Sequence, residues 1–266
     1  MESIRQAVER AKAADPQTAP APQRPPRPAF DVRREEEKSE VNLDTGHLQS
    51  FRIVAYDGKD PRSQPFDLLR TELLGAMDLK GWKVLAVSSP TPGCGKTLVA
   101  VNLALSMARQ PGCTVCLVDL DLRRPQVAPS LGLKPRQGVL EVLEGRTDAD
   151  DAKIAVRVGN SRLEVMPTLP SPNPSDLVAS PAMRTLLQSL AHAKQSRIVI
   201  LDLPPLLTAH DSLSILPQVD CVLLVAAAGT SRVSEIEDCK KYLHATDVIR
   251  VVLNKAPESS KKYVYY

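Results

Sequence analysis

The 266-residue chain has no long hydrophobic run and little net charge. An apolar stretch of about 18 residues marks a membrane-spanning helix, and the sequence contains none. A net charge of +3 is too small to indicate nucleic-acid binding. The opening MESIRQAVERAKAA carries charges where a secretory signal peptide has an apolar core. These absences predict a cytoplasmic protein that binds no nucleic acid.

Cysteines are few and show no pairing pattern. There are five of them, and an odd number does not indicate a disulfide framework. Cys113 and Cys116 form a CxxC, but neither a second CxxC nor a histidine pair accompanies it. We therefore predict small buried residues on a strand rather than a metal site. Cys94 lies before a predicted helix, where a thiol can be acidified, so redox sensitivity stays an alternative there.

The N-terminal segment has a composition that cannot form a hydrophobic core. Apolar residues at helical spacing predict a short amphipathic helix over residues 2–14. Residues 16–28 contain six prolines, which is typical of an extended linker. The sequence thus predicts a disordered extension over residues 1–40, a folded domain over 41–258 and a tail over 259–266.

Short apolar runs alternate with helical patterns through the folded domain. The strand-like runs are 83–88, 114–121, 163–167, 197–205, 221–228 and 249–255, and the helical patterns are 66–77, 97–110, 181–194 and 234–245. Strands that are apolar on both faces and separated by helices predict an α/β fold with a doubly wound, mostly parallel sheet. Ligands bind such sheets at the carboxyl ends of the strands.

The sequence SSPTPGCGKT, residues 88–97, follows one predicted strand and opens a helix. It matches the phosphate-loop pattern GxxxxGK[ST] at Gly95, Lys96 and Thr97, although Pro90 occupies the first glycine position. The loop amides and the helix N-terminus would bind phosphate oxygens. Lys96 would reach the β- and γ-phosphates, and Thr97 would offer its hydroxyl to Mg²⁺.

Carboxylates follow two other predicted strands. Asp119 and Asp121 end one apolar run, and Asp202 ends another. Because the carboxyl ends of parallel strands meet at one edge, these acids and the loop predict an ATP and Mg²⁺ site. Arg123 and Arg124 come next in the chain, and they either touch phosphate or a neighbouring subunit or form an exposed pair.

These motifs resemble those of bacterial tyrosine kinases, the P-loop autokinases of capsule and exopolysaccharide synthesis. SSPTPGCGKT, CLVDLDLRRP and IVILDLPP look like the Walker A, Walker A′ and Walker B motifs of this deviant-Walker group of P-loop NTPases. FDLLRTEL, LPSPNPSDLVAS, VDCVLLVAAAGTSR and VVLNK are similar to further family segments, so the resemblance covers roughly residues 60–266. The N-terminal helix and proline linker look like the exosortase-associated branch.

The resemblance implies transfer of the ATP γ-phosphoryl group to tyrosines of the C-terminal tail. It implies nucleotide contacts from Thr91, Pro92, Gly93, Cys94, Gly95, Lys96, Thr97, Leu98 and Asn254. It implies Mg²⁺ contacts from Thr97, Asp119 and Asp202, and catalytic roles for Lys96, Asp119 and Asp121, with either acid accepting the tyrosine proton.

Three of the five tyrosines are among the last four residues, at Tyr263, Tyr265 and Tyr266. The resemblance makes them phosphoacceptors, and an apolar tail that docks on the domain is the alternative. The implied partners are a transmembrane polysaccharide co-polymerase or adaptor at the inner face of the membrane. Further copies of the chain would form a homo-oligomer through tail exchange.

Two differences between this sequence and the patterns of related proteins leave other functions as alternatives. Partitioning ATPases of the same group carry a signature lysine where this chain has Thr91, which argues against a positioning-type switch ATPase without excluding it. The family's ExxRxxR subunit-contact pattern aligns with Gln64, Asp67 and Arg70, so a ring oligomer is in question. A nucleotide-dependent scaffold of a polysaccharide assembly machine is the remaining alternative.

Overall fold

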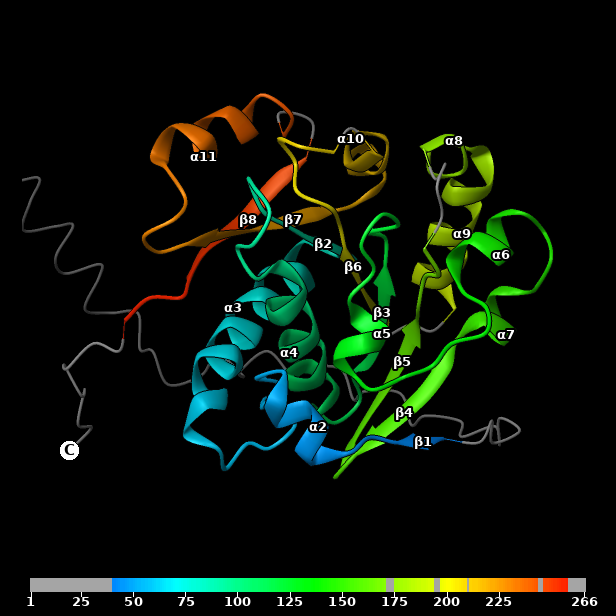
Figure 1. Cartoon of the computed structure of the whole chain (residues 1–266), viewed down its shortest axis with the longest axis horizontal. Helices are drawn as coiled ribbons and strands as arrows, with labels where there is room; N and C mark the ends of the chain where they lie inside the picture. Colours follow the sequence, from blue (N-terminus) through cyan, green and yellow to red (C-terminus); the bar gives the residue numbers. More distant parts are fainter. Residues whose placement is uncertain (1–39, 171–174, 194–196, 210, 244–245, 258–266) are drawn as a thin grey trace, which may run out of the picture. The chain divides into compact units, whose positions relative to one another are not determined.

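The computed structural model describes residues 40–170, 175–193, 197–209, 211–243 and 246–257. Residues 1–39 of the predicted N-terminal extension and the whole tyrosine tail lie outside these residues. Within them, one sheet has the strand order β1-β4-β5-β3-β6-β2-β7-β8 (Figure 1). The strands are β1 (Val41–Asn42), β2 (Val84–Ser88), β3 (Thr114–Asp119), β4 (Ile154–Val158), β5 (Ser161–Met166), β6 (Arg197–Asp202), β7 (Cys221–Ala227) and β8 (Asp247–Asn254).

Helices connect these strands. They are α2 (Thr45–Ser50), the 3₁₀ turn η1 (Pro61–Ser63), α3 (Gln64–Lys80), α4 (Lys96–Ala108), α5 (Val127–Ser130), α6 (Val139–Leu143), α7 (Ala149–Ala152), α8 (Ser175–Val178), α9 (Pro181–His192), α10 (Asp211–Ile215), the 3₁₀ turn η2 (Leu216–Gln218) and α11 (Val233–Lys240). In the part of the chain that the structure describes, no helix combines the length and the apolar character needed to cross a membrane.

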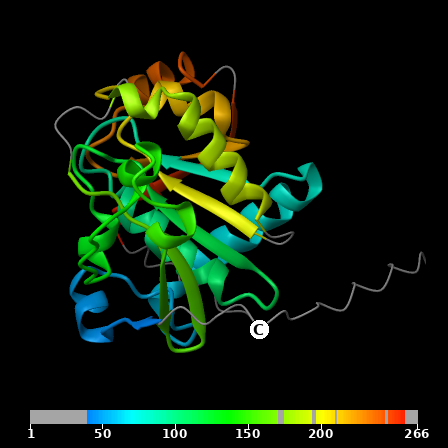
Figure 2. The ribbon, with the colours of Figure 1, turned by 90° about the vertical axis from the view of Figure 1, so that its right-hand side faces the viewer.

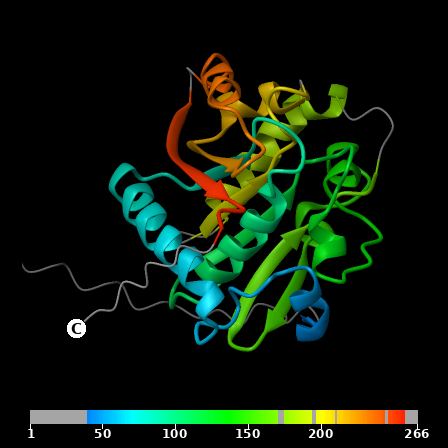
Figure 3. The same cartoon turned by 60° about the vertical axis from the view of Figure 1, so that its left-hand side comes forward.

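The central strands are buried on both faces. Along β2, Leu85 and Val87 face the core that α3 and α4 cover, whereas Val84 and Ala86 face the core that contains α9. Figures 1 and 3 show α3 and α4 side by side, and Figure 2 shows the sheet turned by 90° with helices on either side. The doubly wound α/β fold predicted from the strand and helix patterns is confirmed, because strand neighbours within the described residues run parallel except for β4 and β5.

One edge of the sheet differs from the sequence prediction. The pattern predicted a single strand at 163–167, but β4 and β5 form an antiparallel hairpin whose turn contains Gly159 at φ 55°. Arg157 and Arg162 interrupt the apolar pattern, and in the fold they project on this edge and pair with Glu40. Their charges are paired by tertiary contacts, which a search for apolar runs does not detect.

Helices α3 and α4 are joined by a buried polar network around Asp67. Arg70 Nη1 and Arg109 Nη1 each donate to Asp67 Oδ1 over 2.9 Å, and Ser106 Oγ donates to the same oxygen. Arg70 also donates to the Ser106 carbonyl over 3.1 Å and is only 9% exposed. Two of the positions that align with the subunit-contact pattern are therefore engaged inside their own chain.

The charges of this network shift the titration of Asp67. Burial alone would raise the pKa of the Asp67 carboxyl. The hydrogen bonds from Ser106 and Arg109 and the charges of Arg109 and Arg70 outweigh burial and lower that pKa below its ordinary value of 3.8. Because the folded-state pKa is depressed, the ionised carboxylate stabilises the fold above pH about 4, and this contribution is lost as the pH falls through the folded-state pKa.

We predict that Asp67→Asn lowers the free energy of unfolding by about 1–3 kcal/mol at pH 7, because charged hydrogen bonds become neutral ones. The difference from wild type should be constant above about pH 5 and shrink below about pH 4. Urea denaturation of both proteins at several pH values measures the difference in the free energy of unfolding. Asp247→Asn is the matched control, since its ion pair with Lys80 is exposed on both sides and should contribute little. A difference for Asp67→Asn that grows on acidification would contradict the prediction.

Candidate nucleotide and phosphoryl-transfer site

Predicted site residues lie at the ends of three neighbouring strands, β2, β3 and β6, at one edge of the sheet. Asp119 of β3 is the register partner of Asp202 in β6, and Val87 of β2 pairs with Asp202 on its other side. The loop that follows β2 is fastened to the residues after β6, because the Leu206 and Leu207 amides donate to the carbonyls of Ser89 (2.9 Å) and Pro90 (3.1 Å). The register of the parallel strands therefore places the loop and both acids together.

The phosphate loop needs glycine at two positions. Gly93 and Gly95 have φ values of 82° and 90°, a region that side chains disfavour. A Cβ atom on Gly95 would lie 2.3 Å from Nδ2 of Asn254. That amide donates to the Cys94 carbonyl over 2.9 Å, and Lys255 Nζ donates to the Gly93 carbonyl over 2.7 Å. The end of β8 thus supports the loop directly.

Lys96, at the start of α4, lies among the acids. Its ammonium is 2.8 Å from Asp121 Oδ2 and 3.4 Å from Asp202 Oδ1. Thr97 Oγ1 donates to Asp202 Oδ2 over 2.6 Å. Lys96 and Asp121 are 9% and 7% exposed and Asp202 is fully buried, so these charges interact with little screening by water.

Burial and neighbouring opposite charges shift the pKa values of Lys96 and Asp202 in opposite directions. Burial would lower the pKa of Lys96, but Asp202, Asp121 and Asp119 together outweigh it and raise that pKa, which keeps the ammonium charged. Burial raises the pKa of Asp202 even though Lys96 and Thr97 oppose the shift. Burial and the neighbouring Asp202 charge likewise raise the pKa of Asp119. Ionisation of all three carboxyls around Lys96 is therefore unfavourable, and a further cation would favour their ionised forms.

A cavity of about 580 Å³ opens beside Lys96. Seven of the predicted site residues line it: Pro92, Gly93, Gly95, Lys96, Thr97, Leu98 and Asp121. Arg123 and Arg124 also line it. Thr91, Cys94, Asp119, Asp202 and Asn254 do not. The three tail tyrosines, Tyr263, Tyr265 and Tyr266, lie outside the described residues.

Two of the predicted nucleotide or metal residues have side chains engaged within the protein. Asp119 is fully buried, and its two oxygens accept from the amides of Asp121 (3.1 Å) and Val127 (2.9 Å), which shapes the loop after β3. Cys94 is 1% exposed, and its thiol donates to the Thr91 carbonyl over 3.2 Å. The Cys94 side chain therefore faces the protein, so its contact with a ligand would come from the backbone.

Cys113 is partly buried and packs against the core, and Cys116 is fully buried on β3. Burial raises the pKa of the Cys113 thiol to about 11 and that of the Cys116 thiol to about 12. All five cysteines lie among the described residues and are free. No group of three or more His, Cys, Asp and Glu side chains in the described part of the chain is placed to bind a metal ion by itself.

Mg²⁺ still fits the sheet edge formed by the loop 91–98, Asp121 and Asp202, called the phosphate edge below. This ion binds through one or two protein oxygens together with phosphates and water. The Thr97 hydroxyl and the Asp202 carboxylate, 2.6 Å apart, supply such a pair. Lys96 contacts both groups, at 3.3 Å and 3.4 Å, so a positive charge is already accommodated there.

The cavity has further walls from residues that were not among the predicted site residues. They come from Phe51, Ile53, Gln126, Ser130, Pro204, Pro205, Thr208 and Ala209. Pro204 and Pro205 end the motif IVILDLPP, and their place in it is a signal that could have indicated them. Phe51 and Ile53 precede the phosphate loop by about 40 residues, and only the fold brings them to the cavity.

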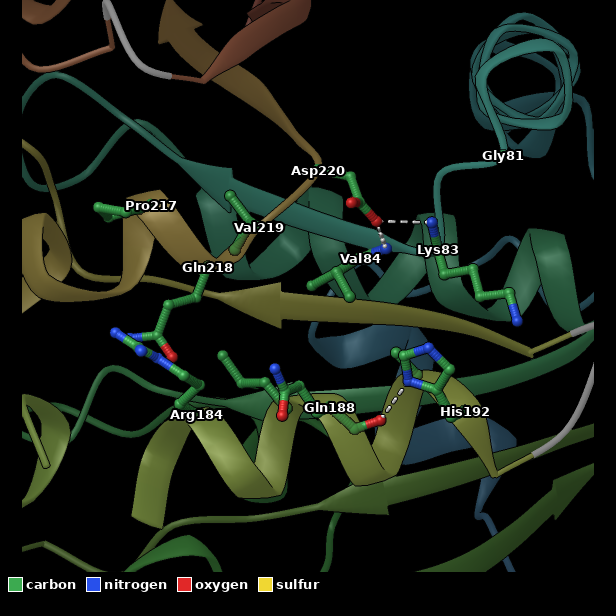
Figure 4. A pocket seen from close by; sticks show the side chains of 12 residues that line it. Gly81, Lys83, Val84, Arg184, Gln188, His192, Pro217, Gln218, Val219 and Asp220 are labelled. Atoms are coloured by element: carbon green, nitrogen blue, oxygen red, sulfur yellow. Dashed lines mark hydrogen bonds between the residues drawn. The ribbon is translucent and has the colours of Figure 1, made fainter. Parts of the chain in front are cut away.

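A second pocket, of about 480 Å³, lies at the opposite ends of the strands. Figure 4 shows Asp220 there, with Oδ2 accepting from the amides of Lys83 (2.7 Å) and Val84 (2.8 Å). The carboxylate therefore satisfies the first amides of β2. Arg184, Gln188 and His192 follow one face of α9 along this pocket. It is separate from the phosphate edge, because it lies where the parallel strands begin.

We predict that Gly95→Ala weakens binding of MgADP by about 10-fold or more, because the new methyl displaces Asn254 and strains the loop. Isothermal titration calorimetry measures the affinity. Gly75→Ala is the matched control: no atom lies within 4 Å of its new methyl on α3, so it should stabilise the helix slightly. Wild-type affinity in a folded Gly95→Ala protein would show that binding does not need this loop conformation.

Comparisons with known proteins agree with this geometry. The family model ParA, described as a NUBPL iron-transfer P-loop NTPase, matches residues 81–253. EpsB of Ralstonia solanacearum is 32% identical over 77% of this chain, which spans 27% of the length of that relative. The tyrosine-protein kinase CpsD of Streptococcus pneumoniae serotype 4 is 33% identical over 68% of this chain and 79% of its own length.

The fold of this chain is also similar to that of a solved tyrosine kinase domain. The kinase domain of the Escherichia coli tyrosine kinase ETK superposes with a TM-score of 0.69 at 27% identity, over 80% of this chain and 84% of that one. The chain therefore belongs to the ParA-type P-loop NTPases and, among them, to the bacterial tyrosine-protein kinases.

Proposed function

We propose that the protein is an ATP-dependent protein-tyrosine autokinase that regulates exopolysaccharide or capsule synthesis or export. The observation that carries this proposal is the cluster of Lys96, Thr97, Asp121 and Asp202 beside an open cavity in a chain of the tyrosine-kinase family. Such a cluster provides the positioning and charge stabilisation on which phosphoryl transfer depends.

Lys96 changes partners when ATP binds. The β- and γ-phosphates compete with Asp121 and Asp202 for its ammonium, which the raised pKa keeps charged. The backbone of residues 91–98 turns around the phosphates, and the N-terminus of α4 adds its partial positive charge. These groups stabilise the charge on the γ-phosphoryl group as it transfers.

Thr97 and Asp202 would hold Mg²⁺, directly or through water, and the ion would supply positive charge to the β- and γ-phosphates. Asp119 contributes by holding the loop of Asp121, since its two oxygens accept from the backbone amides of Asp121 and Val127. Asn254 reaches the nucleotide from the β8 side of the loop that it supports.

Asp121 is the better of the two candidates for the base, because it lines the cavity whereas Asp119 is buried beneath it. The tyrosine oxygen forms a bond to the γ-phosphorus, and the bond from that phosphorus to the β–γ bridging oxygen breaks. ADP leaves with the electron pair. The phenolic proton passes to Asp121, which loses its contact with Lys96 when that ammonium moves to the phosphates.

The proposed acceptors are the tail tyrosines Tyr263, Tyr265 and Tyr266. The site of one copy of the chain phosphorylates the tail of a neighbouring copy. Lys261 and Lys262 precede them, so the unmodified tail carries positive charge toward an acidic edge. Each phosphate adds a charge of roughly −1.5 to −2, which reverses the sign of the tail. Phosphorylation would thus release the copies that the tail links. A transmembrane polysaccharide co-polymerase or adaptor recruits the chain to the inner face of the membrane.

A switch ATPase that positions cargo is the second candidate, favoured by the match to the ParA model. Thr91 at the position of the signature lysine argues against it. Incubation of the purified chain with γ-labelled ATP tests the proposal. Label on tyrosine supports the kinase, release of free phosphate alone supports the switch ATPase, and neither product supports a nucleotide-dependent scaffold.

We predict that Lys96→Met lowers tyrosine labelling by about 100-fold or more, because the loop loses its cation. Labelling with γ-labelled ATP measures it, and a thermal melt of the same sample shows whether the variant is folded. Lys59→Met, an exposed lysine in the loop before α3, is the control and should label normally. Wild-type labelling by folded Lys96→Met protein would contradict the phosphate-loop assignment.

Replacement of Tyr263, Tyr265 and Tyr266 by Phe should remove most of the label and keep the chains associated in the presence of MgATP. Light scattering measures the mass with and without MgATP, and phosphorylation should lower it only in the wild type. Tyr242→Phe is the control, because Tyr242 is a 40% exposed tyrosine outside the tail. Undiminished labelling of the triple variant would place the acceptors elsewhere, and a mass that never changes would exclude release by phosphorylation.

A further inference from the structure

The cavity beside Lys96 has an apolar wall that a phosphate chain does not need. Besides Lys96, Thr97 and Asp121, its lining includes the ring of Phe51. Pro204, Pro205 and Ala209 continue the apolar lining. Triphosphate and Mg²⁺ are highly charged and gain nothing from such a surface. The wall therefore indicates that part of the occupant is apolar.

Phe51 is the most exposed aromatic ring on this wall. It is 41% exposed, whereas Leu48 and Ile53 in the same segment are 0% and 1% exposed. The segment thus buries its aliphatic side chains in the core and leaves its aromatic side chain at the cavity. An exposed aromatic ring that lines a cavity with a few polar groups is typical of a ligand-binding surface.

Contacts to α4 hold Phe51 in place relative to Lys96. The next residue, Arg52, has φ 58°, an unfavourable value for a residue with a side chain. Buried Asn102 stabilises this turn: it donates to the Arg52 carbonyl over 3.2 Å and accepts from the amides of Val54 (2.9 Å) and Ala55 (3.0 Å). Asn102 belongs to α4, the helix that begins with Lys96, so Phe51 and Lys96 share one support.

A second set of contacts holds Phe51 relative to Asp121. The ring of His47 lies 4.8 Å from that of Phe51 with an interplanar angle of 32°. His47 Nε2 is within hydrogen-bond distance, 2.9 Å, of the Pro129 carbonyl. Pro129 is in α5, whose first residue, Val127, donates its amide to Asp119. The aromatic ring is therefore fixed to both loops that flank the cavity, which is the preorganisation that specific binding requires.

We propose that Phe51 forms the surface on which the aromatic ring of the acceptor tyrosine lies, and that it makes the site prefer tyrosine over serine and threonine. This inference rests on the proposed kinase function. Phe51 and Asp121 line one cavity, so a ring stacked on Phe51 would direct its hydroxyl toward Asp121 and the γ-phosphate. Asn254, the residue that the family resemblance assigns to the nucleotide, contacts the Cys94 carbonyl and does not line this cavity, which leaves Phe51 for the acceptor ring.

The test uses the full-length chain and, as acceptor, the synthetic tail peptide SSKKYVYY, whose label is separated from that of the protein by mass. Phe51→Ala should raise KM for the peptide by about 2- to 10-fold, the usual range for one aromatic pair, while KM for ATP and the melting temperature stay unchanged. Phe51→Tyr should behave as wild type and Phe51→Leu should lie between. Leu79→Ala, at an 89% exposed position on α3, is the control and should change neither KM.

A second measurement addresses selectivity without relying on KM. The ratio of kcat/KM for the tail peptide to that for the same peptide with serine in place of tyrosine should fall in Phe51→Ala. A raised KM for ATP with an unchanged KM for peptide would overturn the proposal and make Phe51 a surface for the nucleotide base. Unchanged values for both would also overturn it. If wild type labels no tyrosine at all, the kinase function itself fails, which the wild-type reaction shows before any variant is compared.

Discussion

One lysine set against three buried or nearly buried carboxylates is the constraint on which the site depends. The parallel register of β3 and β6 places Asp119 beside Asp202, and the loop after β3 adds Asp121. Like charges at such a buried edge are unfavourable, which is why burial and mutual repulsion raise the pKa of Asp119. Lys96 and the N-terminus of α4 offset part of this charge. MgATP suits the edge because it brings a cation for the carboxylates and an anion for the lysine together.

Helix α4 links this charge cluster to the rest of the domain. It begins at Lys96, and further along it Asn102 supports the turn after Phe51 while Ser106 and Arg109 bind Asp67 of α3. A displacement of α4 would therefore move Lys96, the turn that follows Phe51 and the contact with α3 together. Asp67 and Arg70 contact their own chain because both side chains bind Ser106 of α4.

Much of the fold could be predicted from the sequence because the central strands are apolar on both faces. Each of β2, β3, β6 and β7 is a continuous apolar run, and each lies where the pattern predicted it. The β4–β5 hairpin was missed in part because it alternates buried and exposed residues, including Arg157 and Arg162. Its position is decided by pairing with its neighbours and by Glu40, which are long-range contacts.

The sequence by itself determined which residues meet at this edge of the sheet. A strand, a glycine-containing loop and a helix predict a phosphate-binding loop over residues 91–98, and acids that end neighbouring parallel strands lie at the same edge. Only the tertiary structure decided which acid faces the cavity, because Asp119 and Asp121 are two residues apart and the loop turns one inward and the other outward. It also decided that Phe51 completes the cavity, because that depends on the docking of α2 against α4 and α5, and no local pattern encodes contacts between segments so far apart in the chain.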